Sequence, residues 1–175
     1  MSITILGAGN MAKGLAGLFA NSGYEVVLGS RDPSKAQAAF ASLGAKVRAT
    51  DIKTAVAASE LVVLAVPFNA VAATIEAAGG LAGKIVVDIT NPLTADYQGL
   101  TIGHTTSAAE EIQKLAPQAK VVKAFNTLFD ATPPTLPPFC RTCANKVLKA
   151  FTTFACGASF WISSAALVVW PIVRP

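Results

Sequence analysis

Residues 3–35 read ITILGAGNMAKGLAGLFANSGYEVVLGSRDPSK, and this stretch decides the fold. It opens with an apolar run at Ile3–Leu6, which is long enough for a buried strand. A glycine-rich turn follows, and Asn10–Asn21 then carries apolar residues at helical spacing. Gly23 ends this helix, and Glu25–Leu28 is a second apolar run. The stretch therefore predicts a strand, a helix and a second strand, with the glycine turn between the first two elements.

The same alternation continues to about residue 126. Further strands are expected at Ala45–Arg48, Leu61–Val66, Lys84–Ile89 and Lys120–Ala124, and further helices at 33–43, 51–58, 69–78 and 108–115. Asp32 is the expected N-cap of the first of these helices, Thr50 or Asp51 that of the second, and Ser107 opens a capping box with Glu110. Strands that alternate with such helices, and that are apolar throughout, indicate a parallel sheet buried on both faces. We predict an α/β fold, a doubly wound parallel sheet of the Rossmann type.

The composition excludes several classes of protein. Of the 175 residues, 53% are hydrophobic and 14% are charged, against a usual charged share of about 25%. Such a chain has enough apolar surface to fold, and three cysteines are too few for a disulfide scaffold. The net charge of +4 arises entirely after Asp130, because all ten acidic residues and ten of the fourteen basic ones precede residue 131. Without a basic stripe, no nucleic-acid partner is expected.

The change in composition near residue 130 divides the chain into a first domain, taken as 1–127, and an atypical tail at 128–175. The tail contains a proline cluster at 133–138, a Cys140-x-x-Cys143 pair without further metal ligands, and 24 uncharged residues at 150–173. That last length is enough to span a bilayer. We favour a frame-shifted or replaced tail over a buried helix and strand that complete the sheet, and over a membrane anchor. With no signal peptide ahead of the first strand, a cytoplasmic protein is expected.

The turn Gly7-Ala8-Gly9-Asn10-Met11-Ala12 has the pattern G-x-G-x-x-A. Gly7 would allow the tight turn, Gly9 would let a pyrophosphate approach the backbone, and Ala12 would let the helix pack closely on the sheet. The free N–H groups at the helix start would bind the phosphates. This context, a strand before the motif and a helix after it, predicts a dinucleotide site.

The end of the second strand indicates which dinucleotide binds. NAD sites place an acid at this tip to hold the ribose 2′-hydroxyl, but here the strand ends in Ser30 and Arg31, and Asp32 is already assigned as an N-cap. Ser30 can donate to a phosphate, Arg31 can bind it bidentately, and Lys35 lies one helical turn further on. The sequence therefore predicts NADP(H) as the cofactor.

Residues 1–127 resemble the NADP oxidoreductases that depend on the deazaflavin coenzyme F420, and the cytosolic domain of six-transmembrane ferric reductases is similar. The matching segments are ILGAGNMAKG (5–14), VVLGSRDPSK (26–35), VVLAVPFNAV (62–71), VVDITNPL (86–93), SAAEEIQKLAP (107–117) and VVKAFNT (121–127). The resemblance implies hydride transfer between NADPH and F420 or a flavin-type acceptor. A small-molecule redox co-substrate is then the expected partner, and a homodimer is compatible with it.

The resemblance also assigns residues. It implies that the pyrophosphate lies on Gly7 to Met11, that the 2′-phosphate contacts Ser30, Arg31 and Lys35, and that three strand ends approach the nicotinamide. These ends are Val66-Pro67, Asn91-Pro92 and Phe125-Asn126. Pro67 and Pro92 are equally interpretable as strand terminators, and Asn126 as a turn residue. No catalytic acid, base or metal ligand is expected, and His104 is interpreted as a loop residue. The two cofactors carry the chemistry.

Two alternatives remain open. GAGNMA also resembles pyrroline-5-carboxylate reductases, but these usually have a lysine where this chain has Val66, and they need a long helical dimerisation domain. The second alternative is a nucleotide-binding module with little turnover, because the expected end of the acceptor pocket is replaced by the tail. Both alternatives keep the dinucleotide site, and they differ in the role of the chain beyond residue 127.

Overall fold

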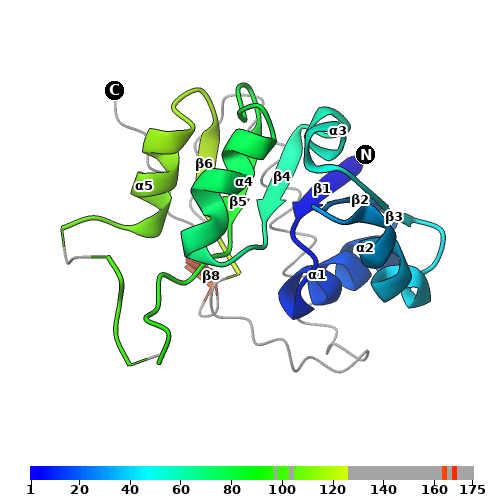
Figure 1. The fold of residues 1–175 in the computed structure, drawn as a ribbon, viewed down its shortest axis with the longest axis horizontal. Helices are drawn as coiled ribbons and strands as arrows, with labels where there is room; N and C mark the ends of the chain where they lie inside the picture. The colour runs from blue at the N-terminus through cyan, green and yellow to red at the C-terminus, as the bar shows by residue number, and fades with distance from the viewer. Residues whose placement is uncertain (97, 103–104, 126–162, 165–166, 169–175) are drawn as a thin grey trace.

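The computed structural model describes residues 1–96, 98–102 and 105–125, together with the backbone of residues 163–164 and 167–168. Six parallel strands form one sheet in the order β3-β2-β1-β4-β5-β6. They are β1 (Ser2–Leu6), β2 (Glu25–Gly29), β3 (Val47–Thr50), β4 (Leu61–Leu64), β5 (Ile85–Asp88) and β6 (Lys120–Lys123). The chain builds outward from β1 in one direction to β3 and then crosses to β4 on its other side (Figure 1). The predicted doubly wound α/β fold is confirmed.

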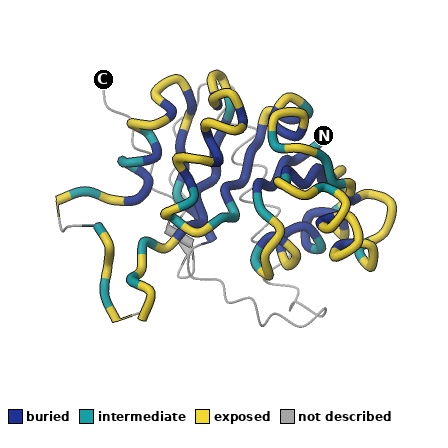
Figure 2. Tube along the Cα trace, viewed as in Figure 1, coloured by how far each residue is buried: buried dark blue, intermediate teal, exposed yellow. Residues whose placement is uncertain are grey.

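Helices cover both faces of this sheet. They are α1 (Asn10–Asn21), α2 (Pro33–Phe40), α3 (Ile52–Ala57), α4 (Val71–Ala77) and α5 (Ala108–Leu115), with short 3-10 turns at Ala41–Leu43 and Phe68–Ala70. Phe19 of α1 and Phe40 of α2 share one core cluster with Ile5, whereas residues of α3, α4 and α5 share a second cluster with Val62. The four inner strands β1, β2, β4 and β5 are buried along nearly their whole length, whereas the edge strands β3 and β6 are partly exposed (Figure 2).

Local signals in the sequence explain where the helices begin. The Asp32 carboxylate accepts from the Lys35 N–H at 3.0 Å, and Asp51 accepts from the Thr54 N–H at 2.9 Å. Ser107 and Glu110 form the predicted reciprocal capping box at the start of α5. Each cap satisfies an amide that has no acceptor within its own helix, which fixes the first residue of the helix.

Several predicted elements differ from the structure at their ends; the strand predicted at 61–66, for example, ends at Leu64. Three of the differences have an identifiable cause. The third strand is Val47–Thr50 rather than 45–48, because Gly44 ends the preceding turn and its carbonyl accepts from the Val47 N–H at 3.2 Å. The helix predicted at 33–43 tightens into a 3-10 turn after Phe40, and the one predicted at 69–78 starts with a 3-10 turn. Helix termini often tighten in this way, and periodicity alone does not reveal it.

Little of the tail lies within the described residues. Its two described strands, β7 (Ser163–Ser164) and β8 (Leu167–Val168), pair antiparallel in a separate small sheet and add no strand to the large one. The proline cluster at 133–138, Cys140, Cys143 and most of 150–173 lie outside the described part of the chain. Within that part, no helix combines the length and apolar character needed to cross a membrane.

The two glycines of the turn after β1 should respond differently to substitution. Gly7→Ala is expected to lower the free energy of unfolding by at least about 2 kcal/mol, because Gly7 has φ +123° and its Cβ would lie 2.3 Å from the Ala65 carbonyl oxygen. Gly9→Ala should cost about 1 kcal/mol or less, because nothing lies within 4 Å of its Cβ position. Urea unfolding of both variants measures the difference, and equal losses would contradict this assignment.

Candidate functional site

Backbone hydrogen bonds bring the ends of three strands together around the glycine turn. The Gly7 N–H donates to the Gly29 carbonyl at the end of β2, at 3.0 Å. The Ala65 N–H, just after β4, donates to the Leu6 carbonyl at 2.9 Å. The turn therefore lies between β2 and β4, at the point where the strand order reverses. Open α/β sheets bind their ligands at this point, outside the carboxyl ends of the strands.

The turn itself has the shape that a phosphate needs. Gly9 is exposed and serves as the N-cap of α1, and no side chain caps this helix. The space where a Cβ of Gly9 would lie is open, whereas Ala12 is fully buried under the helix. The exposed start of α1 thus offers backbone amides and the positive end of the helix dipole to an anion. This geometry fits the pyrophosphate of a dinucleotide.

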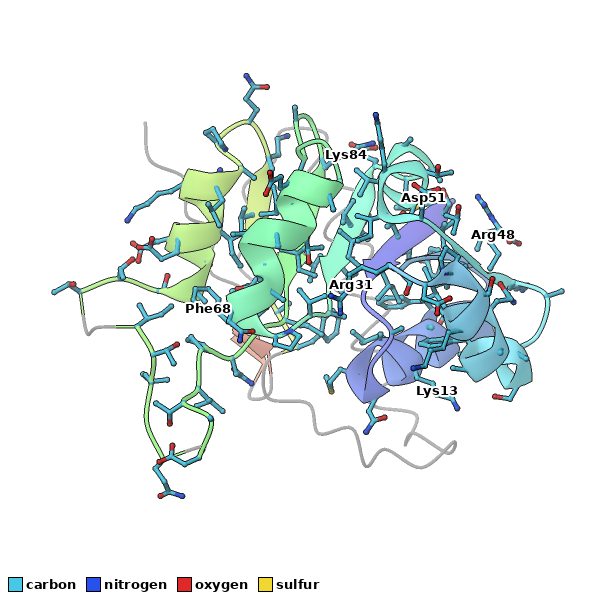
Figure 3. The ribbon with its side chains drawn as sticks, viewed as in Figure 1. Lys13, Arg31, Arg48, Asp51, Phe68 and Lys84 are labelled. Atoms are coloured by element: carbon cyan, nitrogen blue, oxygen red, sulfur yellow. The ribbon has the colours of Figure 1, made fainter. Side chains whose placement is uncertain are left out.

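The tip of β2 carries cationic and hydroxyl groups next to this turn. Arg31 and Lys35 are exposed, and the Ser30 hydroxyl accepts from the Asp32 N–H at 3.2 Å. The Asp32 carboxylate caps α2, so its Oδ1 is already engaged with the Lys35 amide. In the view of Figure 3, Arg31 lies near the centre, whereas Arg48 of β3 lies toward the right-hand side. The tip is therefore suited to a phosphate rather than to a free 2′-hydroxyl.

The predicted nicotinamide end is only partly assembled from the described residues. Val66 and Pro92 are half-buried, and Pro67 and Asn91 are exposed, all directly after β4 or β5. Phe68, which follows Pro67, and Lys84, at the start of β5, lie at opposite ends of this half of the sheet (Figure 3). The predicted residues of β4 and β5 therefore share the edge that carries the glycine turn.

Phe125 differs from these residues because its side chain belongs to the core. It is 3% exposed, and its ring lies edge-to-face against Phe19 of α1 with centroids 6.5 Å apart. Its φ of +59° lies in the left-handed region, which is rare for a bulky residue. The ring of Phe125 thus anchors the exit of β6 on α1. Asn126 and His104 lie outside the described residues.

Sequence reasoning missed one group at this edge, a buried ion pair between β5 and β6. Asp88 is 0% exposed, and its Oδ2 lies 2.9 Å from the Lys123 Nζ. The signal was present in the sequence. Two neighbouring apolar strands, IVVD and KVVK, both end in a charged residue. Because the strands are parallel, those two charges had to meet at one edge.

Apart from Asp88 and Lys123, no titratable groups of the described residues form an ion pair at this edge. The pKa of Asp51 is lowered by its hydrogen bonds from Thr54, that of Asp96 by the Thr94 hydroxyl, and that of Glu111 by Lys114. Each of these carboxylates lies at a helix start, in a loop or on a helix surface. No group of three potential metal ligands occurs in the described residues either. The edge offers groups for binding and orientation.

A separate hollow of about 540 Å³ lies at the opposite, amino edge of the sheet, between Met1, Ser59 and Lys84. Two of its polar side chains have partners within the protein. The Ser2 hydroxyl donates to the Ala58 carbonyl at 2.8 Å, and the Lys84 ammonium donates to the Ser59 carbonyl at 2.9 Å. This hollow lies at the edge opposite to the glycine turn.

Comparison with known proteins finds a matching family and several similar proteins. The family described as "NADP oxidoreductase coenzyme F420-dependent" matches residues 2–92. The metalloreductase STEAP3 of Rattus norvegicus is 36% identical over 126 residues, which is 72% of this chain and 24% of that protein. The F420-dependent NADP reductase of Methanothermobacter marburgensis is 30% identical over 143 residues, covering 73% of this chain and 64% of that protein. Among solved structures, a putative F420-dependent NADP reductase from Arthrobacter sp. FB24 matches with a TM-score of 0.69 and 31% identity, over 85% of this chain and 79% of the other.

The assignment of Asp32 as a helix cap can be tested by two substitutions. Asp32→Ala should lower the free energy of unfolding by about 1 kcal/mol, because the Lys35 amide loses its acceptor. Asp32→Asn should keep most of the stability, because the side-chain amide oxygen still accepts. Thermal unfolding measures both effects. A selective loss of dinucleotide affinity in the Asn variant, at unchanged stability, would instead place the carboxylate on the ribose.

Proposed function

Because the chain belongs to the family of coenzyme F420-dependent NADP oxidoreductases, we propose that it binds NADP(H) along the carboxyl edge of its sheet and transfers a hydride. The proposed acceptor or donor is a deazaflavin of the F420 type or a flavin. One observation carries the proposal: the uncapped, exposed start of α1 lies beside a strand tip with Ser30 and Arg31 in place of an acid. The first feature suits a pyrophosphate and the second a 2′-phosphate.

The proposed roles follow from the positions of the residues. The backbone at Gly7, Gly9, Asn10 and Met11 holds the pyrophosphate, and the side chains of Ser30, Arg31 and Lys35 hold the 2′-phosphate. The chain ends of β4 and β5, at Val66-Pro67 and Asn91-Pro92, border the nicotinamide. When bound, the nicotinamide supplies the hydride. The chain then needs to fix ring positions and exclude water, and it needs no proton relay of its own.

The acceptor is the least constrained part of this proposal. The chain spans about a quarter of the length of the metalloreductase and 64% of the methanogen reductase that it resembles. A nucleotide-binding module with little turnover therefore remains the second candidate. For the pyrroline-5-carboxylate reductase alternative, the half-buried Val66 in place of a lysine is an argument against.

Absorbance at the NADPH band separates the two main candidates. The protein is mixed with NADPH, and F420 or a free flavin is then added. Loss of the NADPH band that depends on both protein and acceptor supports the oxidoreductase. Tight NADPH binding without such a loss supports the binding module, and failure to bind NADPH contradicts both.

Gly9→Val should abolish NADPH binding while leaving the fold intact. The added side chain enters the open space in which the pyrophosphate is proposed to approach the backbone, and apart from adjoining chain no protein atom lies within 4 Å of its Cβ position. Fluorescence titration with NADPH measures binding, and circular dichroism during heating measures the fold. A variant that binds NADPH normally would refute the proposed phosphate site.

Arg31→Ala should remove most of the preference for NADPH over NADH. A charge-assisted contact with the 2′-phosphate contributes about 1.5–3 kcal/mol, and NADH lacks that phosphate. Arg48→Ala is the matched control, because it removes the same charge from the neighbouring strand β3, on the outer side of the molecule (Figure 3). Titrations of the three proteins with both nucleotides give the preference. Equal losses in the two variants would mean that only general charge matters.

A further inference from the structure

The ion pair of Asp88 and Lys123 occupies the last rung of the β5–β6 ladder. The two residues are direct partners in the register, and every other residue of β5 is apolar. Burying a carboxylate is costly, and a well-packed apolar pair usually serves stability as well as or better than a buried ion pair. A contribution to stability therefore does not account for this pair, and what it contacts at the end of β5 becomes the relevant question.

The pair holds both backbone groups of a single residue beyond the sheet. The Thr90 N–H donates to the Oδ1 of Asp88 at 2.8 Å, and the Lys123 ammonium donates to the Thr90 carbonyl oxygen. Thr90 is 4% exposed and lies past the end of β5, where no ladder partner fixes the backbone. The next residues, Asn91 and Pro92, return to the surface of the carboxyl edge. The ion pair thus determines the path by which the chain leaves β5.

Asp88 also fixes the backbone at the end of β6. The Ala124 N–H donates to the Asp88 carbonyl at 3.1 Å, and Phe125 then turns with φ +59° so that its ring packs on Phe19. The two chain exits that border the proposed nicotinamide end therefore share one buried carboxylate residue. The Lys123 side chain is 22% exposed and directs its ammonium to Asp88 and Thr90.

We propose that Asp88 and Lys123 are positioning residues that set the Thr90–Asn91 backbone against which the nicotinamide ring of NADP(H) lies. This inference rests on the proposed function. It assigns neither residue a contact with the dinucleotide. Their effect is exerted through the backbone of Thr90, so it should be confined to the nicotinamide half of the ligand, because β4 lies between β5 and the strand that leads into the pyrophosphate turn.

The test compares two ligands that differ only in the nicotinamide ring, NADPH and 2′-phospho-ADP-ribose. The principal variant is the double substitution Asp88→Asn with Lys123→Met, which removes both charges and so leaves no unpaired buried ion. We expect its NADPH dissociation constant to rise about tenfold, as misplacement of a positioning group does, while that for 2′-phospho-ADP-ribose stays unchanged. Lys123→Arg, which keeps the charge and the donors, should bind NADPH nearly as well as the unaltered protein.

Lys120→Met is the matched control, because Lys120 is an exposed lysine at the other end of the same strand. It should leave both dissociation constants unchanged. Isothermal titration of the 175-residue proteins measures the dissociation constants. Hydrogen exchange at the Thr90 amide in the ligand-free protein reports whether its hydrogen bond to Asp88 is kept. We expect faster exchange in the double variant.

Distinct results overturn the inference and the proposed function. Equal weakening for both ligands would show a general structural role, and unchanged NADPH affinity in the double variant would show no role at this site. Either result overturns the positioning inference while leaving NADP(H) binding intact. If the unaltered protein binds neither ligand, the proposed function itself fails.

Discussion

The carbonyl oxygen of Ala65 occupies the space in which a side chain at residue 7 would lie. This steric constraint allows only glycine there, and it reflects how closely β4 approaches the end of β1. The close approach lets the chain turn sharply from β1 into α1, so the start of α1 lies at the point where the strand order reverses. The exposed amides at that point and the buried contact of Ala12 with the sheet are both consequences of it.

Polar side chains inside the sheet are used differently at its two edges. Near the amino edge, the buried Thr4 hydroxyl is hydrogen-bonded to the Ala55 carbonyl at 2.6 Å and to the Ser59 hydroxyl at 2.9 Å, which ties β1 to the end of α3. At the carboxyl edge, the buried Asp88 reaches past the end of its strand to Thr90 and across to Lys123. The Thr4 hydrogen bonds join β1 to a neighbouring helix. The Asp88 contacts instead fix the backbone just beyond the end of β5.

The sequence was sufficient for the fold because its local signals agreed with one another. The apolar runs of β1, β2, β4, β5 and β6, and the caps Asp32, Asp51 and Ser107, all predicted the elements that the structure contains. Boundaries were less predictable where the backbone tightens, as after Phe40 and before Val71, since a 3-10 turn and an α-helical turn share nearly the same spacing of apolar residues.

The candidate site was predictable where a motif specifies backbone geometry and less predictable where tertiary contacts decide. The conformation of Gly7 and the capping role of Asp32 follow from short-range patterns. The burial of the Phe125 ring on Phe19 depends on residues 106 positions apart, and the meeting of Asp88 with Lys123 depends on strand register. Such contacts require the topology before any single residue can be interpreted.

The cap at Asp32 also bears on how the cofactor preference of this protein can change over evolution. In a protein where one acidic residue both binds the ribose 2′-hydroxyl and caps the following helix, a substitution that changes the cofactor preference also destabilises that helix. Here the carboxylate that stabilises α2 belongs to Asp32, whereas Arg31 is exposed and the Ser30 hydroxyl contacts only the Asp32 backbone just before the helix. Substitutions at those two exposed or half-buried positions are therefore available to selection at little cost in folding. Cofactor choice in this chain can drift independently of the stability of its scaffold.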